Sequence, residues 1–291
     1  MEIVRRIGAL PISFAMSSVV TDINEYPWKL ARHSTEIAEG EVHVWLSNLS
    51  AACSVMSLME RTLSDDEVSR ASRYLRKESR LEFTLGRGLL RLLLGSYLER
   101  DPGELKFTAG LHGKPEVTGD PKLCPVQFNV SHSHGAVLHA FSLGRRVGVD
   151  IERIRQDFSG HDVAQRFFSR REAAFISSQP EASQPKVFFT TWARKEALLK
   201  ARGMGLSGSL DGTEIPQSAE VPEMLVRIAE ETGESSCWFV ADLDAGANFA
   251  AALAVEGMNL KVTLRRWVGE EPHATPDGHC KAQAAAAFKS E

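Results

Sequence analysis

The segment RVGVDIE at residues 146–152 alternates apolar and acidic side chains over its last four positions. Successive side chains of a β-strand point to opposite faces, so Val149 and Ile151 enter one layer while Asp150 and Glu152 share the other. The Cα atoms of the two acidic residues then lie roughly 6.5–7 Å apart. Two carboxylates at this spacing can share a hard cation such as Mg²⁺, and the alternative is a solvated strand face.

A second chemical signal lies in the segment WARKEALLK at residues 192–200. Trp192, Glu196 and Lys200 recur every four residues and therefore form one stripe on a helix. A tryptophan anchor beside an ordinary Glu–Lys surface pair would explain the stripe without any function. In the functional alternative, Glu196 is a third metal ligand or a proton acceptor, and Lys200 neutralises phosphate charge.

Strands and helices surround these segments in a repeated order. Strands are predicted at 41–46, 126–130, 136–143, 146–152, 237–242 and 249–255. Helices are predicted over 79–98 and 187–202, and after two capping boxes, Ser64 with Glu67 and Ser169 with Glu172. This order predicts two α+β halves that meet near Arg145, covering 41–145 and 146–268. They are preceded by an N-terminal extension, 1–40, and followed by a flexible tail, 269–291.

Composition limits the class of protein. Of the 291 residues 43% are hydrophobic and 25% are charged, as in ordinary soluble globular proteins. The formal net charge is −4, so any anion site must be local, and neither nucleic acid nor membrane is an expected partner. The four cysteines form no CxxC pair, which favours reduced thiols and a cytoplasmic location. The apolar run at 7–20 is interrupted by Pro11 and too short to span a bilayer, so no secretion signal is expected.

Basic side chains follow helical spacing in the first half. They are Arg73, Lys77, Arg80, Arg87 and Arg91, with Arg70 just upstream. Against the net charge of −4 this stripe is the natural place for phosphates or an acidic partner. A solvated helix face, diluted by Glu78 and Glu82, is the alternative.

Loops and strand ends supply further polar residues. Lys114 follows a glycine on a loop and is a good point charge for phosphate. Ser131 and His132 end a strand, but they point to opposite faces and lack a GxSxG elbow, which argues against a hydrolase pair. His132 and His134 share a strand-like face, as a zinc pair would, but no third His or Cys follows at ligand spacing. The GxGxxG match at 203–208 follows a helix instead of a strand, which argues against a dinucleotide site.

Taken in order, five motifs resemble the Sfp-type 4′-phosphopantetheinyl transferases: GKP (113–115), FNVSHS (128–133), GVDIE (148–152), FFS-x-x-E (167–172) and WARKEALLKARGMGL (192–206). The resemblance implies two pseudo-symmetric halves, each a small antiparallel sheet packed with helices, with the active site between them. It implies a Mg²⁺-dependent, monomeric enzyme that transfers phosphopantetheine from coenzyme A to a serine of an acyl or peptidyl carrier protein. Adenosine 3′,5′-bisphosphate is released.

The motif match also assigns residues. Asp150, Glu152 and Glu196 take the Mg²⁺ positions. Glu196, or a water beside it on the ion, is the expected base, and Lys200 the catalytic cation. Contacts with coenzyme A are expected from Arg70, Gly113, Lys114, Pro115, Asn129, Ser131, His132, Asp150 and Lys200. Arg80 or Arg87 is added from the basic stripe alone.

Two other activities stay open on these residues. A catalytically silent coenzyme A-binding or nucleotide-binding regulator would be marked by loss of a metal carboxylate, and all three are present. A metal-dependent phosphohydrolase would use the same carboxylates with water as the nucleophile. The sequence names neither the carrier nor its pathway.

Overall fold

The computed structural model describes residues 36–49, 56–110, 114–118, 126–158, 160–204, 213–216, 223–229 and 235–267. Most of the predicted extension, all of the predicted tail, Gly113 and most of the GxGxxG match lie outside these ranges.

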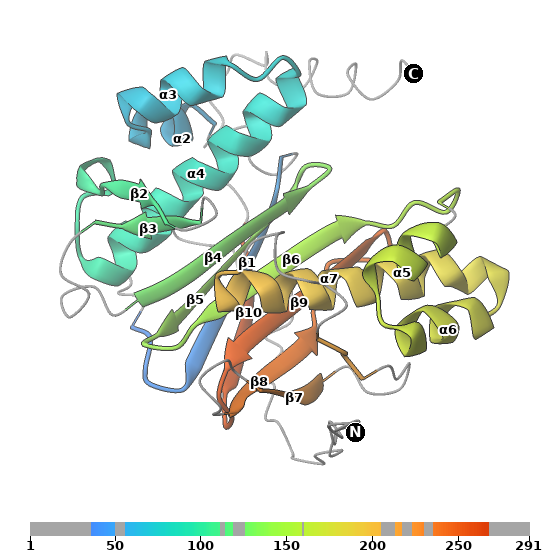
Figure 1. Cartoon of the computed structure of the whole chain (residues 1–291). Coiled ribbons are helices and arrows are strands. Elements are labelled where there is room, and N and C mark those ends of the chain that lie inside the picture. Colours follow the sequence, from blue (N-terminus) through green and yellow to red (C-terminus); the bar gives the residue numbers. More distant parts are fainter. Residues whose placement is uncertain are drawn as a thin grey trace.

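The elements follow one another in two runs (Figure 1). The first run contains β1 (Glu41–Asn48), α2 (Met56–Thr62), α3 (Asp65–Ser72), α4 (Lys77–Leu98), β2 (Phe107–Ala109), β3 (Pro115–Val117), β4 (Val126–Ser133) and β5 (Ala136–Leu143). The second contains β6 (Val147–Arg153), α5 (His161–Phe167), α6 (Arg170–Ser178), α7 (Gln184–Arg202), β7 (Glu223–Ala229), β8 (Ser235–Asp242), β9 (Phe249–Glu256) and β10 (Lys261–Arg266).

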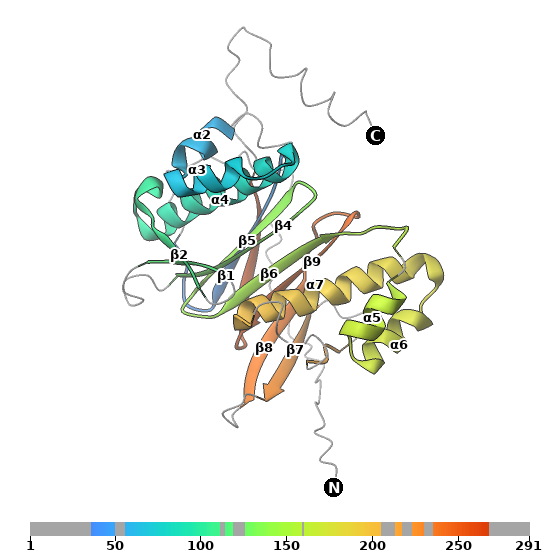
Figure 2. The ribbon, with the colours of Figure 1, turned by 45° about the horizontal axis from the view of Figure 1, so that its top comes forward.

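Two four-stranded sheets organise the molecule, with strand orders β10-β1-β5-β4 and β6-β9-β8-β7. All their neighbouring strands are antiparallel except β1 and β10, which are parallel. The helix α4 lies on the outer side of the first sheet and α7 on the outer side of the second (Figures 1 and 2). The α+β fold with sheets packed by helices is therefore confirmed.

The apolar side chains form a core in each layer. Leu85, Leu89 and Phe141 belong to the cluster between α4 and the first sheet. Alternate strand residues of both sheets, among them Val44, Val149, Ile151, Leu253 and Val255, form a second cluster between the sheets. The third cluster lies between α7 and the second sheet, where β9 contributes Ala250, Ala252 and Ala254. These small side chains let α7 approach the sheet closely.

The edge strands β4 and β6 join the two sheets through side chains. Asn129 Oδ1 accepts a hydrogen bond from Val149 N at 3.0 Å, and Ser133 Oγ accepts one from Arg153 N at 3.2 Å. Between them, Ser131 Oγ lies 3.4 Å from Ile151 N. Alternate residues of β4 thus satisfy backbone donors that an edge strand would otherwise leave open. This ladder fixes β4 relative to the strand that carries the acidic pair.

Some elements escaped the sequence analysis. β10 lies in the stretch assigned to the second half, yet it pairs with β1, where Lys261 Nζ is 2.7 Å from Glu41 Oε1. A partner 220 residues away leaves no local pattern. β7 and the β2–β3 hairpin were also missed. The division at Arg145 stays a prediction, and β10 shows that the second segment also completes the first sheet.

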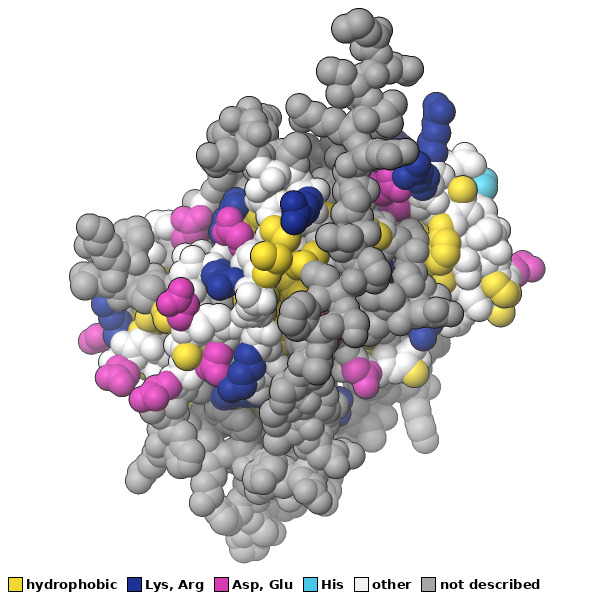
Figure 3. Space-filling model, turned by 90° about the horizontal axis from the view of Figure 1, so that it is seen from below, with side chains coloured by type: hydrophobic (Ala, Val, Ile, Leu, Met, Phe, Trp, Pro, Cys, Tyr) yellow, Lys and Arg dark blue, Asp and Glu magenta, His cyan; other side chains and the backbone are white. Residues whose placement is uncertain are grey.

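Acidic and basic side chains are interspersed on the described part of the face shown in Figure 3. This mixture agrees with a chain of small net charge.

Candidate active site

The acidic pair of β6 faces the helix α7. Val149 and Ile151 are buried between the sheets, as their alternation predicts, so Asp150 and Glu152 point the other way. Asp150 is 3% exposed and Glu152 is half-buried. The solvated strand face considered as the alternative is therefore wrong for Asp150.

Gly148 permits the contact between β6 and α7. A Cβ at this position would overlap the backbone of Ala197 and Ala201. The residue is glycine because the helix backbone occupies the space that a side chain needs. The sequence analysis did not assign this role, although a glycine directly before an alternating strand segment was its visible signal.

Lys200 reaches from α7 to the acidic strand. Its Nζ atom is 2.6 Å from Asp150 Oδ1 and 3.0 Å from Ser131 Oγ. Ser131 Oγ in turn donates to Asp150 Oδ1 at 2.9 Å. Three of the predicted site residues, from β4, β6 and α7, therefore form one triangle. Trp192, the first member of the helix stripe, instead stacks on Phe188 with ring centroids 6.0 Å apart, as an anchor does.

The carboxylates of the site are incompletely satisfied. Within the described ranges, neither Asp150 Oδ2 nor Glu196 Oε1 has a hydrogen-bond partner, and both atoms are buried. Burial, reinforced by the charge of Asp150, raises the pKa of Glu152 to about 7. Burial also raises the pKa of Glu196, with Asp150 adding to the rise and Lys200 opposing it. Glu152, Glu196 and Asp150 are thus close enough to sense one another electrostatically.

The donor set suits a hard cation, although no cage is preformed. Among the described residues, no group of three or more His, Cys, Asp or Glu side chains is arranged to hold a metal ion. Two buried carboxylate oxygens nevertheless lack partners. Oxygen atoms of this kind are the ligands that Mg²⁺ prefers, and it needs only one or two carboxylates from the protein.

Lys114 and Asn129, two further residues predicted to bind coenzyme A, also contact other parts of the protein. Lys114 Nζ lies 3.4 Å from both Val147 O and Lys200 O, and burial lowers its pKa. Asn129 is buried and bonded to Val149 N, as part of the ladder between the sheets. Pro115 begins β3, next to Lys114. Gly113 lies outside the described residues.

The two histidines of the β4–β5 hairpin do not share a strand face. His132 is exposed, and its Nδ1 atom lies 3.6 Å from Glu82 Oε2 on α4. His134 lies in the turn with a φ of 46°. The strand-like face that the sequence suggested for a zinc pair is therefore absent.

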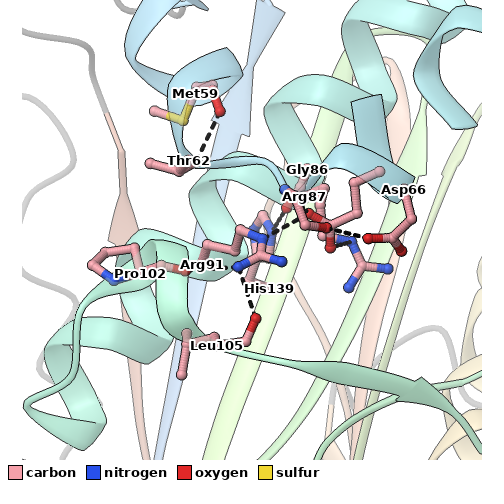
Figure 4. A network of polar contacts seen from close by, with 11 residues as sticks. Met59, Thr62, Asp66, Gly86, Arg87, Arg91, Pro102, Leu105 and His139 are labelled. Carbon is pink, nitrogen blue, oxygen red and sulfur yellow. Dashed lines mark hydrogen bonds and ion pairs between the residues drawn. The ribbon is translucent and has the colours of Figure 1, made fainter. Parts of the chain in front are cut away.

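The basic stripe is not one surface. Arg73 falls between α3 and α4, and Arg91 is 2% exposed. Arg91 Nε is 2.7 Å from Glu67 Oε2, and Arg87 Nε is 3.4 Å from Glu67 Oε1. Figure 4 shows the guanidinium groups of Arg87 and Arg91 beside each other, with Arg91 directed at the carbonyls of Pro102 and Leu105. The solvated face considered as the alternative is wrong for Arg87 and Arg91. It holds for Arg70, Arg73, Lys77 and Arg80, which are exposed.

Arg70, Arg80 and Arg87 were the cations of the stripe considered as ligands of coenzyme A. Arg70 is exposed, with its guanidinium 5.1 Å from the ring centroid of Phe83, and Arg80 is also exposed. Arg87 packs over Phe107, and its Nη1 atom is buried with no hydrogen-bond partner in the described part of the chain. Binding of coenzyme A by Arg70 and Arg87 stays a prediction.

A second ion pair on α7 escaped the sequence analysis. Lys195 Nζ lies 2.6 and 2.7 Å from the two carboxylate oxygens of Glu172, and both side chains are buried. The same carboxylate accepts Ser169 N in the capping box and Ile215 N. Lys195 also donates to Thr213 O at 2.6 Å. Of the two adjacent residues in the motif, Lys195 therefore contacts Glu172 on α6, whereas Glu196 lies near Asp150 on β6.

Comparison with known proteins places the chain in a family. The profile of the 4′-phosphopantetheinyl transferase superfamily matches residues 146–254. The 4′-phosphopantetheinyl transferase HetI of Nostoc is 34% identical over 233 residues, which cover 80% of this chain and 95% of HetI. The chain belongs to the 4′-phosphopantetheinyl transferase family. The family predicted from the motifs is confirmed.

Other relatives of this transferase come from Bacillus subtilis. The 4′-phosphopantetheinyl transferase ffp is 31% identical over 57% of this chain and 79% of its own length. Sfp is 30% identical over 51% of this chain and 64% of its own length. None of the helices in the described ranges combines the length and apolar character needed to cross a membrane.

Proposed function

We propose that this transferase moves the 4′-phosphopantetheine group from coenzyme A to a serine hydroxyl of an apo acyl or peptidyl carrier protein. The serine oxygen forms a bond to the β-phosphorus of coenzyme A, and the bond from that phosphorus to the bridging oxygen breaks. Adenosine 3′,5′-bisphosphate leaves with the bridging oxygen, and the serine proton passes to a base on the enzyme.

One observation carries this proposal: Asp150 and Glu196 each keep a buried carboxylate oxygen that no described residue bonds, and the ammonium of Lys200 lies beside Asp150. We assign Asp150, Glu152 and Glu196 as the residues that would hold Mg²⁺. The ion, when bound, supplies positive charge to offset the charge that develops on the diphosphate.

The residues of the chain itself account for the rest of the chemistry. Lys200, whose side chain is 29% exposed, is free to contact a phosphate, and Lys114 lies against the same end of α7. Fixed positive charge at this place stabilises a phosphoryl transition state. Glu196 is assigned as the base, because burial raises the pKa of its carboxyl group and so makes it a stronger proton acceptor than an ordinary glutamate. A base of this kind typically contributes about 10²–10⁴-fold to the rate.

We further propose that the enzyme acts as a monomer in the cytoplasm. All the residues assigned to the site come from one chain, and the spacing of the cysteines favours reduced thiols.

Mass spectrometry of apo carriers incubated with the enzyme, coenzyme A and Mg²⁺ tests the proposal. We expect one phosphopantetheine mass to be added to a carrier from fatty acid, polyketide or nonribosomal peptide synthesis. Asp150→Ala should abolish the addition, while Asp157→Ala, which changes an exposed aspartate in the loop that follows β6, should not. Release of adenosine 3′,5′-bisphosphate without transfer would instead identify a phosphohydrolase. Binding of coenzyme A without turnover would identify a regulator, and full activity of Asp150→Ala would refute the metal assignment.

A further inference from the structure

Lys200 neutralises Asp150, one of the carboxylates that would help to hold the metal ion. Its Nζ atom is 2.6 Å from Asp150 Oδ1, and Asp150 is almost fully buried. The hydrogen bond from Ser131 Oγ to the same oxygen, and the contact of Ser131 with Lys200 Nζ, hold the pair in place. The charge of Asp150 is therefore balanced by a cation of the chain itself.

An ammonium this close interferes with a divalent cation on the same carboxylate. Like charges a few ångströms apart repel strongly where water is partly excluded. Binding of Mg²⁺ at Asp150 is therefore most favourable once Lys200 has another anion to neutralise. The Lys200 side chain is 29% exposed and lies near the end of α7, which Gly203 terminates in the left-handed conformation.

We propose that Lys200 is an intramolecular competitor of the metal ion, which coenzyme A removes. A phosphate of coenzyme A attracts the Lys200 ammonium away from Asp150, and the freed carboxylate then binds Mg²⁺. This inference rests on the proposed function of the site. Because coupling between two binding sites is reciprocal, Mg²⁺ also tightens the binding of coenzyme A by the same factor. The enzyme thereby avoids holding the metal without its substrate.

Other charges near Asp150 do not replace Lys200 in this role. Lys114 Nζ lies against the backbone oxygens of Val147 and Lys200. Glu152 and Glu196 raise the local negative charge, which attracts whichever cation is present. Lys200 is the cation that the structure pairs with Asp150 among the described residues.

Titration calorimetry with Mg²⁺, with and without coenzyme A and without any carrier, tests the coupling. For the unaltered protein we expect Mg²⁺ to bind about 10-fold more tightly when coenzyme A is present, which is within the range usual for coupled sites. Lys200→Met should bind Mg²⁺ alone about 10-fold more tightly than the unaltered protein, and coenzyme A should tighten Mg²⁺ binding by a smaller factor than in the unaltered protein. Lys186→Met, an exposed lysine of the same helix, is the matched control and should behave as the unaltered protein.

Equal or weaker Mg²⁺ binding by Lys200→Met, or a coenzyme A effect as large in this variant as in the unaltered protein, would overturn the inference. Thermal unfolding of each variant tests whether it is folded. If Lys200→Met is not folded, Lys200→Gln is used in its place. The carrier assay distinguishes a failure of the competitor role from a failure of the proposed function. An unaltered protein that transfers phosphopantetheine but shows no metal coupling refutes the competitor role alone. A protein that transfers nothing refutes the proposed function.

Discussion

Lys195 and Lys200 lie on the same helix, and each neutralises a buried carboxylate, but the two ion pairs differ in completeness. Both oxygens of Glu172 accept hydrogen bonds from Lys195 and from backbone donors. Asp150 uses only one oxygen, and the other has no partner in the described part of the structure. Buried polar atoms in native proteins are nearly always paired, so an unpaired one needs an explanation. The first pair is complete without a ligand, whereas the second leaves ligand positions open.

The difference between the two ion pairs suggests that one serves stability and the other serves activity, although both lysines belong to one motif. The Lys195–Glu172 pair ties α6, α7 and the segment 213–216 together. The Lys200–Asp150 pair ties α7 to β6, next to Glu152 and Glu196, whose pKa values are raised by burial and by the charge of Asp150. We therefore expect changes at the first pair to affect folding, and changes at the second to affect the reaction.

The largest expected effect is the loss of the complete pair. Lys195→Met leaves Glu172 charged, buried and without its counterion, which typically costs about 3–5 kcal/mol of unfolding free energy. Chemical denaturation measures the loss. Lys195→Met combined with Glu172→Leu should recover part of it, because a buried ion pair is often replaceable by apolar side chains. A single variant that loses less than about 1 kcal/mol would show that the pair is not structural.

A smaller loss of unfolding free energy is expected when the contact between β6 and α7 is disturbed. Gly148→Ala places a methyl group against the backbone of Ala197 and Ala201, and overpacking of this kind costs about 1–3 kcal/mol. Because the contact positions Asp150 opposite Lys200, transfer activity should fall as well.

Gly86→Ala on α4 is the matched control for that prediction. Its added Cβ meets only Val137 Cγ1 at 3.5 Å, an ordinary contact. Alanine is the better helix former, so this variant should gain about 0.5–1 kcal/mol. Equal unfolding midpoints for the two variants would contradict the close approach at Gly148.

Removing an unpartnered charge should stabilise the metal-free protein while it abolishes the reaction. Glu196→Gln replaces a buried carboxylate whose Oε1 atom has no partner among the described residues. We expect the unfolding free energy without Mg²⁺ to rise by about 0.5–2 kcal/mol, the usual gain when a functional site is relieved. Phosphopantetheine transfer should be lost. A clear loss of stability in this variant would place Glu196 with the complete ion pair instead.

The smallest effect concerns pH. Folded Glu152 releases its proton near pH 7, because its pKa is raised from 4.5 to about 7. Between these values the folded state binds a proton that the unfolded chain has released. The resulting stability is fully present below pH 4.5 and is lost as the pH rises through about 7.

Thermal unfolding at pH 5.5 and pH 8 with EDTA measures that dependence. The unaltered protein should lose more stability over this interval than Glu152→Gln. Identical pH dependence in the two proteins would show that Glu152 is not held in the environment described.

Local patterns were sufficient for the elements that carry the site. The alternation in GVDIE placed Asp150 on the face opposite to Val149, and the capping box at Ser169 is confirmed by its hydrogen bond from Glu172 N at 3.2 Å. The regular spacing of Glu196 and Lys200 placed both on α7.

Long-range contacts were not visible in the same way. The spacing of Arg87 and Arg91 indicated a helix face, but their burial follows from Glu67, which lies on another helix. The ladder from Asn129 to Val149 N depends on how two sheets meet. Periodicity reports which side chains share a face, and it carries no information on what that face contacts.

The parallel pairing of β10 with β1 has a consequence for biosynthesis. A ribosome releases β1 and its antiparallel neighbour β5 long before residues 261–266 emerge, so the nascent first sheet has an open edge at β1 throughout that time. This sheet is consequently completed only after residues 261–266 have been synthesised. Chains truncated before β10 should expose the unpaired backbone N–H and C=O groups of β1 and be prone to self-association.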